Sequence, residues 1–268
     1  MMVFDARTGF ESPFESTLLL AARPPEDAGT LNRLLDALRP SESAAAQRFV
    51  HAADRAAYLS AHALLRCSLS RLALAAGSNC PPAFWQFESG EHGKPQLLQT
   101  GPLPGAQVSL SHSRSMVAIA IGFSGPLGVD VEPIDHPHAH ARESAPVVFT
   151  DSECSWIDAT ENALSERFAR LWTAKEAWAK ALGAGLSHDL RTLSVDLRSG
   201  RYHSGKPGHW QADLRWQLHA WHMGGHIVSL ACSPAREIEP ETLRALPVRL
   251  PGLDLDTTLL AQRITPSS

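Results

Sequence analysis

A long helical segment, a turn and a run of short strands follow one another twice along this sequence. In the first round, apolar residues recur at helical spacing over residues 44–76, and the strands that follow end near Phe123. In the second round, residues 162–182 have a helical pattern, and the last strand ends near Cys232. A helix buries its apolar stripe against a neighbouring sheet, so each round can form its own core. The order predicts the α+β class, with two similar halves rather than one continuous sheet.

The predicted halves occupy residues 1–126 and 127–234, and residues 235–268 form a weakly periodic, Pro-rich tail. We expect Ser41 to cap a helix that begins beside Pro40, and the helical segment to divide near Asp54. Residues 133–146 contain prolines and histidines without periodicity, and we expect a loop there. Strands are predicted at 17–22, 84–88, 107–112, 116–123, 127–131, 192–197, 214–220 and 226–232.

Charge and hydropathy restrict the class of partner. The 24 basic and 28 acidic residues give a formal charge of −4, whereas proteins that bind bulk nucleic acid usually carry a basic excess. The longest apolar stretch, residues 116–123, is too short to cross a bilayer, and residues 1–15 lack the pattern of a signal peptide. We therefore expect a cytoplasmic protein with neither a nucleic-acid nor a membrane partner.

The segment from Gly128 to Glu132 reads Gly-Val-Asp-Val-Glu at the end of a predicted strand. Alternate residues of a strand face the same side, so the side chains of Asp130 and Glu132 project together. Two neighbouring carboxylates repel each other unless a cation lies between them, and oxygen ligands of this kind suit Mg²⁺. Because Asp-x-Glu is a common sequence, an ordinary solvated strand end fits the same residues.

A second motif lies on the predicted helix of the second half. Trp172, Glu176 and Lys180 are each four residues apart, so they line up along one edge of that helix. The pattern fits either a surface ion pair or a carboxylate and an ammonium group in a site beside packed tryptophans. Gly183 and Gly185 follow, as glycines commonly do at a helix C-terminus.

Two shorter motifs carry groups that can bind phosphate. Ser111 and His112 end a predicted strand, where they face opposite sides, and this disfavours a nucleophile–base pair. Gly93, Lys94 and Pro95 form a predicted tight turn that presents an ammonium group. Each motif is also compatible with an ordinary polar strand end or turn.

The order of these motifs resembles the 4′-phosphopantetheinyl transferase superfamily, and within it the surfactin-synthetase-activating type. The resemblance runs from Leu38 to Cys232, and the segment from Pro40 to Arg66 is similar to the helical signature near the N-terminus of the family. The matching motifs are Gly-Lys-Pro at 93–95, Ser-His-Ser at 111–113, Gly-x-Asp-x-Glu at 128–132, Phe149 with Glu153, and Trp-x-x-Lys-Glu-Ala-x-x-Lys-x-x-Gly-x-Gly-Leu at 172–186.

This resemblance implies a monomeric pseudo-dimer of two α+β halves, with the active site at their interface and coenzyme A bound there. The implied reaction transfers the 4′-phosphopantetheine arm of coenzyme A to a serine hydroxyl of an apo acyl or peptidyl carrier protein. Adenosine 3′,5′-bisphosphate is released, and Mg²⁺ is required. The resemblance does not indicate which carrier protein, or which biosynthetic pathway, is served.

The resemblance also implies a role for each motif. Asp130, Glu132 and Glu176 would hold Mg²⁺, and Glu176 would accept the proton of the carrier serine. Lys180 and His112 would contact phosphate oxygens and stabilise the leaving group. The implied coenzyme A contacts comprise Arg48, Arg55, Gly93, Lys94, Pro95, Ser111, His112 and Lys180.

The sequence departs from the family pattern where the 3′-phosphate of coenzyme A is usually held. Basic residues common between the positions of Glu42 and Arg48 are replaced by Ser43, Ala44, Ala45 and Ala46, and Ala57 stands where a second arginine often follows Arg55. Either Arg48 and Arg55 compensate for these missing charges, or coenzyme A binds more weakly. Two alternatives stay open: a non-enzymatic pseudo-dimer that binds a carrier protein or a nucleotide, and a Mg²⁺-dependent phosphodiesterase or nuclease.

Overall fold

The computed structural model describes residues 17–90, 93–98, 101–135, 141–160, 163–183, 185, 188–206, 209–233 and 262–263 of the 268-residue chain. These residues divide into two compact units. Unit 1 contains the described residues of Met1–Glu88 and Pro95–Gly125. Unit 2 contains those of Ser89–Lys94, Pro126–Glu237 and Leu260–Ser268. The predicted limits at 126 and 234 stay a prediction, and most of the predicted tail lies outside the described residues.

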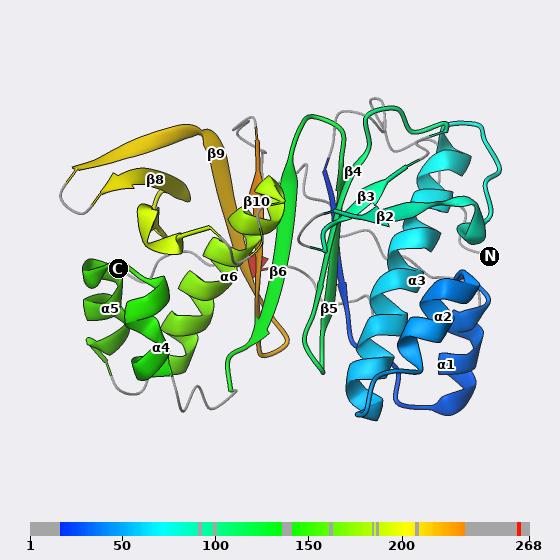
Figure 1. Cartoon of the computed structure of the whole chain (residues 1–268), viewed down its shortest axis with the longest axis horizontal. Helices are drawn as coiled ribbons and strands as arrows, with labels where there is room; N and C mark the ends of the chain where they lie inside the picture. The colour runs from blue at the N-terminus through cyan, green and yellow to red at the C-terminus, as the bar shows by residue number, and fades with distance from the viewer. Residues whose placement is uncertain are drawn as a thin grey trace. The chain divides into compact units, whose positions relative to one another are not determined.

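Unit 1 combines a three-stranded antiparallel sheet, in the order β1-β5-β4, with three helices and a two-stranded sheet of β2 and β3 (Figure 1). The first strand pairs with β5, with Leu18 opposite Ile121. The elements are β1 (Leu18–Ala22), α1 (Ala28–Leu35), α2 (Pro40–Ala46), α3 (Ala52–Ala75), the 3-10 turn η1 (Pro82–Phe84), β2 (Phe87–Ser89), β3 (Pro95–Leu97), β4 (Gln107–His112) and β5 (Val117–Gly122).

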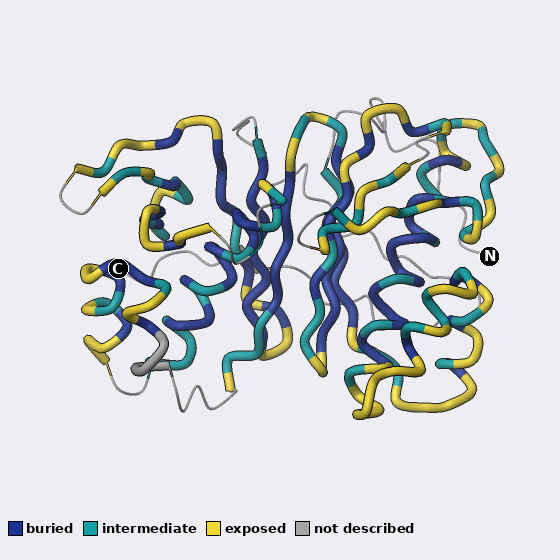
Figure 2. The backbone as a smooth tube through the Cα atoms, viewed as in Figure 1, coloured by how far each residue is buried: buried dark blue, intermediate teal, exposed yellow. Residues whose placement is uncertain are grey.

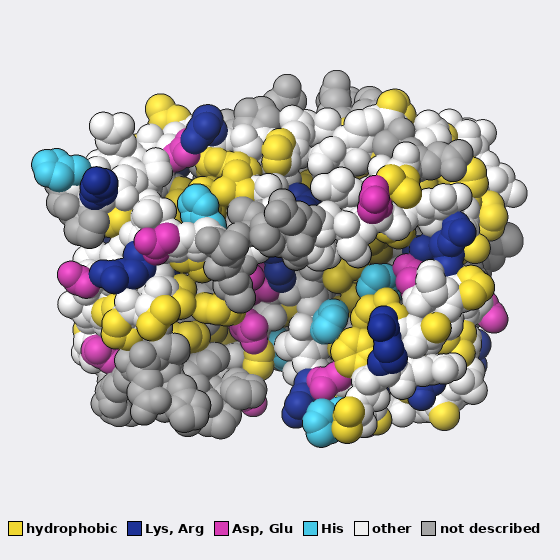
Figure 3. All heavy atoms as spheres, viewed as in Figure 1, with side chains coloured by type: hydrophobic (Ala, Val, Ile, Leu, Met, Phe, Trp, Pro, Cys, Tyr) yellow, Lys and Arg dark blue, Asp and Glu magenta, His cyan; other side chains and the backbone are white. Residues whose placement is uncertain are grey.

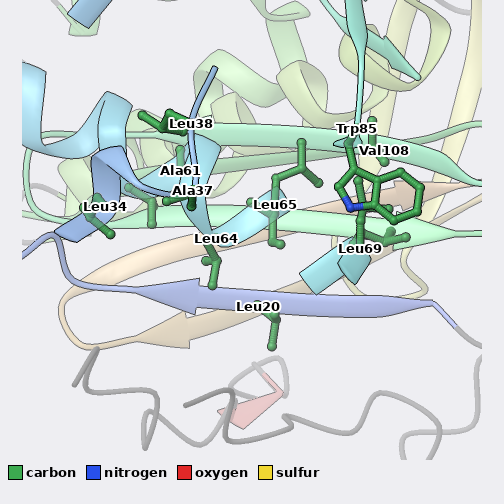
Figure 4. Packing of buried hydrophobic residues seen from close by; sticks show 14 of the residues in the cluster. Leu20, Leu34, Ala37, Leu38, Ala61, Leu64, Leu65, Leu69, Trp85 and Val108 are labelled. Carbon is green, nitrogen blue, oxygen red and sulfur yellow. The ribbon is translucent and has the colours of Figure 1, made fainter. Parts of the chain in front are cut away.

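The long helix α3 contributes more residues to the core of unit 1 than any other element. Its alanines and leucines favour a helix, and Leu64, Leu65 and Leu69 are completely buried, or nearly so, in a cluster that also contains Val108 of β4 and Trp85 (Figure 4). The helix ends where Gly77 takes a left-handed conformation, with φ of +82°.

Unit 2 is built on an antiparallel sheet in the order β6-β10-β9-β8-β7, with β11 paired to β9 (Figure 1). Its elements are β6 (Leu127–Pro133), α4 (Ala141–Val148), α5 (Asp151–Asp158), α6 (Leu164–Leu182), the 3-10 turn η4 (Leu190–Thr192), β7 (Leu193–Asp196), β8 (Arg201–Lys206), β9 (His209–Met223), β10 (His226–Cys232) and β11 (Gln262–Arg263).

Helix α6 packs on β6 and β10, and one face of it forms the core of unit 2. Leu171, Ala174 and Trp178 lie in this core together with Leu218 of β9 and Ala231 of β10. Figure 2 shows β10 buried along its length, while helix α5 exposes one side. This packing leaves the opposite edge of α6, with Trp172, Glu176 and Lys180, only partly buried.

The α+β class is confirmed, and several local expectations need correction. Helices α2 and α3 are separated by residues 47–51 rather than near Asp54, and Arg39, not Ser41, is the N-cap, because Pro40 already occupies the first turn. Helix α4 occupies the last part of the predicted loop. Its Pro146, which has no N–H to donate within the helix, lies two residues before the helix ends.

None of the helices in the described part of the chain is both long enough and apolar enough to cross a bilayer.

Candidate active site

The acidic end of β6 faces helix α6. Gly128, Asp130 and Glu132 alternate along the strand and therefore share one face. A β-carbon at Gly128 would overlap the carbonyl oxygen of Ala177 and the backbone nitrogen of Ala181, both in α6. Only glycine allows this close approach, which places Asp130 and Glu132 beside α6.

Helix α6 presents the residues that were expected to line one of its edges. The Nζ atom of Lys180 donates a hydrogen bond to Oδ1 of Asp130 over 2.6 Å. The Trp172 side chain is hydrogen-bonded to Glu132. The helix ends at Gly183, which has a left-handed φ of +71°. The structure thus brings Asp130, Glu132 and Lys180 together, although they are distant in sequence.

The electrostatics of this cluster favour proton uptake. Burial raises the pKa of Glu132 to about 7, and the charges of Asp130 and Glu176 act in the same direction, while Lys180 and the Trp172 hydrogen bond oppose them. Burial and the charge of Asp130 likewise raise the pKa of Glu176, against the effect of Lys180. Three carboxylates therefore share one ammonium group, and the cluster carries a surplus of negative charge.

The donor set fits a hard cation such as Mg²⁺. The Oε1 atom of Glu176 is buried and has no hydrogen-bond partner among the described residues. Within that part of the chain, no group of three or more His, Cys, Asp or Glu side chains is gathered tightly enough to hold a metal ion by itself. Mg²⁺ commonly binds through one or two carboxylates, waters and substrate phosphates, so a complete protein cage is not needed.

A buried ion pair, which the sequence motifs did not predict, supports α6. Lys175 donates to Oε2 of Glu153 over 2.6 Å and to the carbonyls of Leu190, over 2.9 Å, and Val148, over 3.2 Å. Glu153 also accepts from the backbone nitrogens of Thr150 and Val195, each over 2.9 Å. The Phe149-to-Glu153 motif and the Lys-Glu pair at 175–176 were the available signals, but neither indicates this contact.

The expected turn at Gly93, Lys94 and Pro95 is present. Gly93 takes a φ of +83° and donates to the carbonyl of Gly90, while Pro95 begins β3. Lys94 lies in unit 2, where its Nζ atom donates to the carbonyls of Leu127, over 2.9 Å, and Ala181, over 3.1 Å. Burial lowers the pKa of Lys94 to about 8.

Lysine is scarce in this chain and concentrated in unit 2. Four of the 24 basic residues are lysines. Lys94, Lys175 and Lys180 are buried or half-buried, and each has its ammonium group hydrogen-bonded within unit 2. Lys206, in β8, is exposed. The compact ammonium group is thus used mainly where it contacts buried oxygens.

The other predicted site residues lie in unit 1. Ser111 is buried and His112 is half-buried at the end of β4, just before the turn in which Ser113 donates to the carbonyl of Met116 over 2.8 Å. Arg48 follows α2 and Arg55 lies in the first turn of α3, and both are exposed.

The positions at which the sequence lacks the basic residues of the family pattern differ in their burial. Ala57 is completely buried in the core of unit 1, so a side chain at this position faces the core rather than solvent. Ala46 is also buried, whereas Ser43 and Ala45 are half-buried and Ala44 is exposed. Of these positions, Ala44 is the one at which a basic side chain would reach solvent most readily.

Glu42 belongs to a compensated cluster in unit 1. Its carboxylate accepts from Arg66 Nε over 2.8 Å and lies 3.0 Å from Nδ1 of His62. Arg66 is almost completely buried and also donates to the carbonyls of Pro82 and Trp85. This network joins α2 to α3.

The comparisons with known proteins agree with the motif order. The family model of the 4′-phosphopantetheinyl transferase superfamily matches residues 126–231. A protein of Synechocystis sp. with the provisional name 4′-phosphopantetheinyl transferase is 30% identical over 179 residues, covering 65% of this chain and 70% of its own. A 4′-phosphopantetheinyl transferase of Bacillus subtilis is 30% identical over 176 residues, covering 65% and 73%. The 4′-phosphopantetheinyl transferase Sfp of Bacillus subtilis strain 168 is 31% identical over 169 residues, covering 62% and 69%.

Proposed function

Because the chain belongs to the 4′-phosphopantetheinyl transferase superfamily, we propose that it transfers the 4′-phosphopantetheine arm of coenzyme A to a serine hydroxyl of an apo acyl or peptidyl carrier protein. The observation that carries the proposal is the cluster of Asp130, Glu132, Glu176 and Lys180, which lies in the segment matched by the family model. Adenosine 3′,5′-bisphosphate is the second product.

Asp130, Glu132 and Glu176 are the residues that would hold Mg²⁺. When bound, the ion would neutralise negative charge on the diphosphate of coenzyme A. Among the described residues, this cluster consists of the three carboxylates and Lys180, so an anionic substrate needs added positive charge to approach it.

Glu176 is the proposed base. Its Oε1 atom is buried without a hydrogen-bond partner among the described residues, so it can accept the proton of the carrier serine. The serine oxygen forms a bond to phosphorus, and the bond from phosphorus to the bisphosphate oxygen breaks. Lys180 donates hydrogen bonds to the phosphate oxygens on which negative charge develops.

Residues of unit 1 are proposed to bind coenzyme A. Arg48 and Arg55 are exposed cations that can contact phosphate, and Ser111 and His112 offer hydrogen-bonding groups at the end of β4. Gly93 and Pro95 shape the turn proposed to lie along the nucleotide. We further propose that the enzyme acts as a monomer in the cytoplasm, which size-exclusion chromatography and cell fractionation would test.

The formal charge of −4 favours a small anionic substrate over a polyanion. On the face shown in Figure 3, basic and acidic side chains lie interspersed rather than grouped by sign. A nuclease would need a broad basic surface for its substrate.

Intact-mass spectrometry of carrier proteins provides the deciding test. Purified protein is incubated with coenzyme A, Mg²⁺ and several apo carriers, and we expect a gain of the phosphopantetheine mass. A carrier with its acceptor serine replaced by alanine is the matched control and should not change. If the protein binds coenzyme A but transfers the phosphopantetheine arm to none of the carriers, the proposed transferase activity is contradicted and the non-enzymatic alternative is supported.

A further inference from the structure

A six-residue segment brings Lys94 to the active-site helix. Ser89–Lys94 belongs to unit 2, although the chain before and after it belongs to unit 1. The ammonium group of Lys94 donates to the carbonyl oxygens of Leu127 and Ala181, over 2.9 and 3.1 Å. The side chain therefore spans two elements of unit 2 that are not adjacent in sequence.

Each of these carbonyls belongs to an element that carries the carboxylate cluster. Leu127 is the first residue of β6, three residues before Asp130, and Ala181 follows Lys180 in the last turn of α6. The last four carbonyls of a helix have no partner within the helix. A cation at this end both satisfies such a carbonyl and is favoured by the helix dipole.

The same two elements touch where Lys94 binds. Gly128, next to Leu127, allows the backbone of β6 to lie against Ala177 and Ala181 of α6. Gly183, which ends α6, lies near the Lys94 side chain, because a β-carbon there would be 3.9 Å from its Cδ atom. Lys94 thus binds at the junction where the C-terminal turn of α6 packs against the start of β6.

We propose that Lys94 is a positioning residue, which joins β6 to the C-terminal turn of α6 and so holds Glu176 and Lys180 beside Asp130 and Glu132. The predicted effect of Lys94 on catalysis rests on the proposed function, whereas its predicted effect on the structure of α6 does not. The positioning role is an alternative to the expected contact of Lys94 with coenzyme A, since two of the three N–H donors of the ammonium group already bind carbonyls.

Replacement by methionine removes the charge and keeps most of the length of the side chain. For Lys94→Met, we expect kcat to fall by roughly 10- to 100-fold while the KM for coenzyme A changes by less than about threefold, since misplaced catalytic groups slow the chemical step without weakening substrate binding. Lys94→Arg, which can donate to both carbonyls, should restore much of kcat. Lys206→Met is the matched control and should behave like the parent.

Amide hydrogen exchange tests the proposal without relying on transfer activity. We expect Lys94→Met to exchange faster in the last turn of α6, around Ala181–Gly183, and Lys206→Met to leave that exchange unchanged. If Lys94→Met fails to fold, Lys94→Arg with normal exchange and normal kcat would support the role. A raised KM for coenzyme A with unchanged kcat and unchanged exchange would overturn it and favour a direct phosphate contact. If the parent protein shows no transferase activity but Lys94→Met still exchanges faster in the last turn of α6, only the proposed function is contradicted.

Discussion

The long helices of the two units, α3 and α6, are both fixed by a buried cation, but the charges around them balance differently. In unit 1, Arg66 of α3 binds Glu42 and two backbone carbonyls. In unit 2, Lys175 of α6 binds Glu153 and two backbone carbonyls. Each cation joins its helix to a preceding helix and to a 3-10 turn.

Unit 2 also contains a carboxylate cluster whose negative charge is not balanced by its one ammonium group. Hydrogen bonds from His62 and Arg66 contribute to a lowered pKa of Glu42, whereas burial and neighbouring carboxylates raise the pKa of Glu132. A compensated charge stabilises the fold, and a cluster with surplus charge costs stability unless a ligand binds it. The difference separates supporting charges from those available for chemistry.

The strongest test of this separation removes one carboxylate from the cluster. For Glu176→Gln, we expect turnover to fall by about 10²- to 10⁴-fold because the proposed base is lost, while coenzyme A still binds. The free energy of unfolding should rise, because a buried like charge is removed. Glu166→Gln, on the same helix, is the control. Steady-state transfer, calorimetric binding of coenzyme A and urea unfolding measure these effects, and parental turnover in Glu176→Gln would contradict the base assignment.

Removing either buried cation should destabilise its unit. For Arg66→Met and Lys175→Met, we expect a loss of roughly 3–5 kcal/mol in the free energy of unfolding, because a buried carboxylate is left without its partner. Arg114→Met breaks an exposed pair with Asp54 and should cost less than about 1 kcal/mol. Urea unfolding checks all three variants. Adding Glu153→Gln to Lys175→Met should restore part of the loss, and no recovery would show that packing, not charge, dominates there.

A methyl group at Gly128 should disturb the packing of α6 against β6 in unit 2. Its β-carbon would overlap the backbone of α6, so we expect Gly128→Ala to cost about 1–3 kcal/mol and to lower turnover as α6 shifts. Gly29→Ala, in the short helix α1, should change stability by no more than about 1 kcal/mol. Thermal unfolding and transfer assays would show this difference, and equal effects of the two substitutions would argue against a special packing role for Gly128.

A pH-dependent effect is expected in unit 1, where Glu42 makes the fold sensitive to acid. Burial alone would raise the pKa of Glu42, but hydrogen bonds from His62, Arg66 and the Arg39 backbone lower it from 4.5 to about 2. The stabilisation by the ionised carboxylate is therefore complete above pH 4.5 and is lost as the pH falls from 4.5 towards 2. Urea unfolding at several pH values should show that the free energy of unfolding depends less steeply on pH in Glu42→Gln than in the parent. An unchanged pH dependence would exclude Glu42 as the source of the acid sensitivity.

Sequence periodicity predicted helices and strands more reliably than it predicted contacts between side chains. Strands β4 and β10 occur at the predicted residues, because their apolar runs end at clear turns. The first part of helix α4 was predicted as a loop because the prolines and histidines of residues 133–146 show no helical periodicity. The motifs indicated which residues form the cluster, but the Lys180–Asp130 pair joins residues 50 positions apart. The Lys94 contacts use backbone carbonyls, which every residue carries, so no sequence pattern could indicate them.

The burial of the lysines has a practical consequence for surface chemistry. Lys206 is the exposed lysine in the described part of the chain, whereas Lys94, Lys175 and Lys180 are hydrogen-bonded through their ammonium groups. Amine-directed reagents should therefore modify Lys206 on β8 well before those three. Coupling through this amine would attach the protein to a sensor or a bead by β8, on an element that carries none of the carboxylates of the cluster.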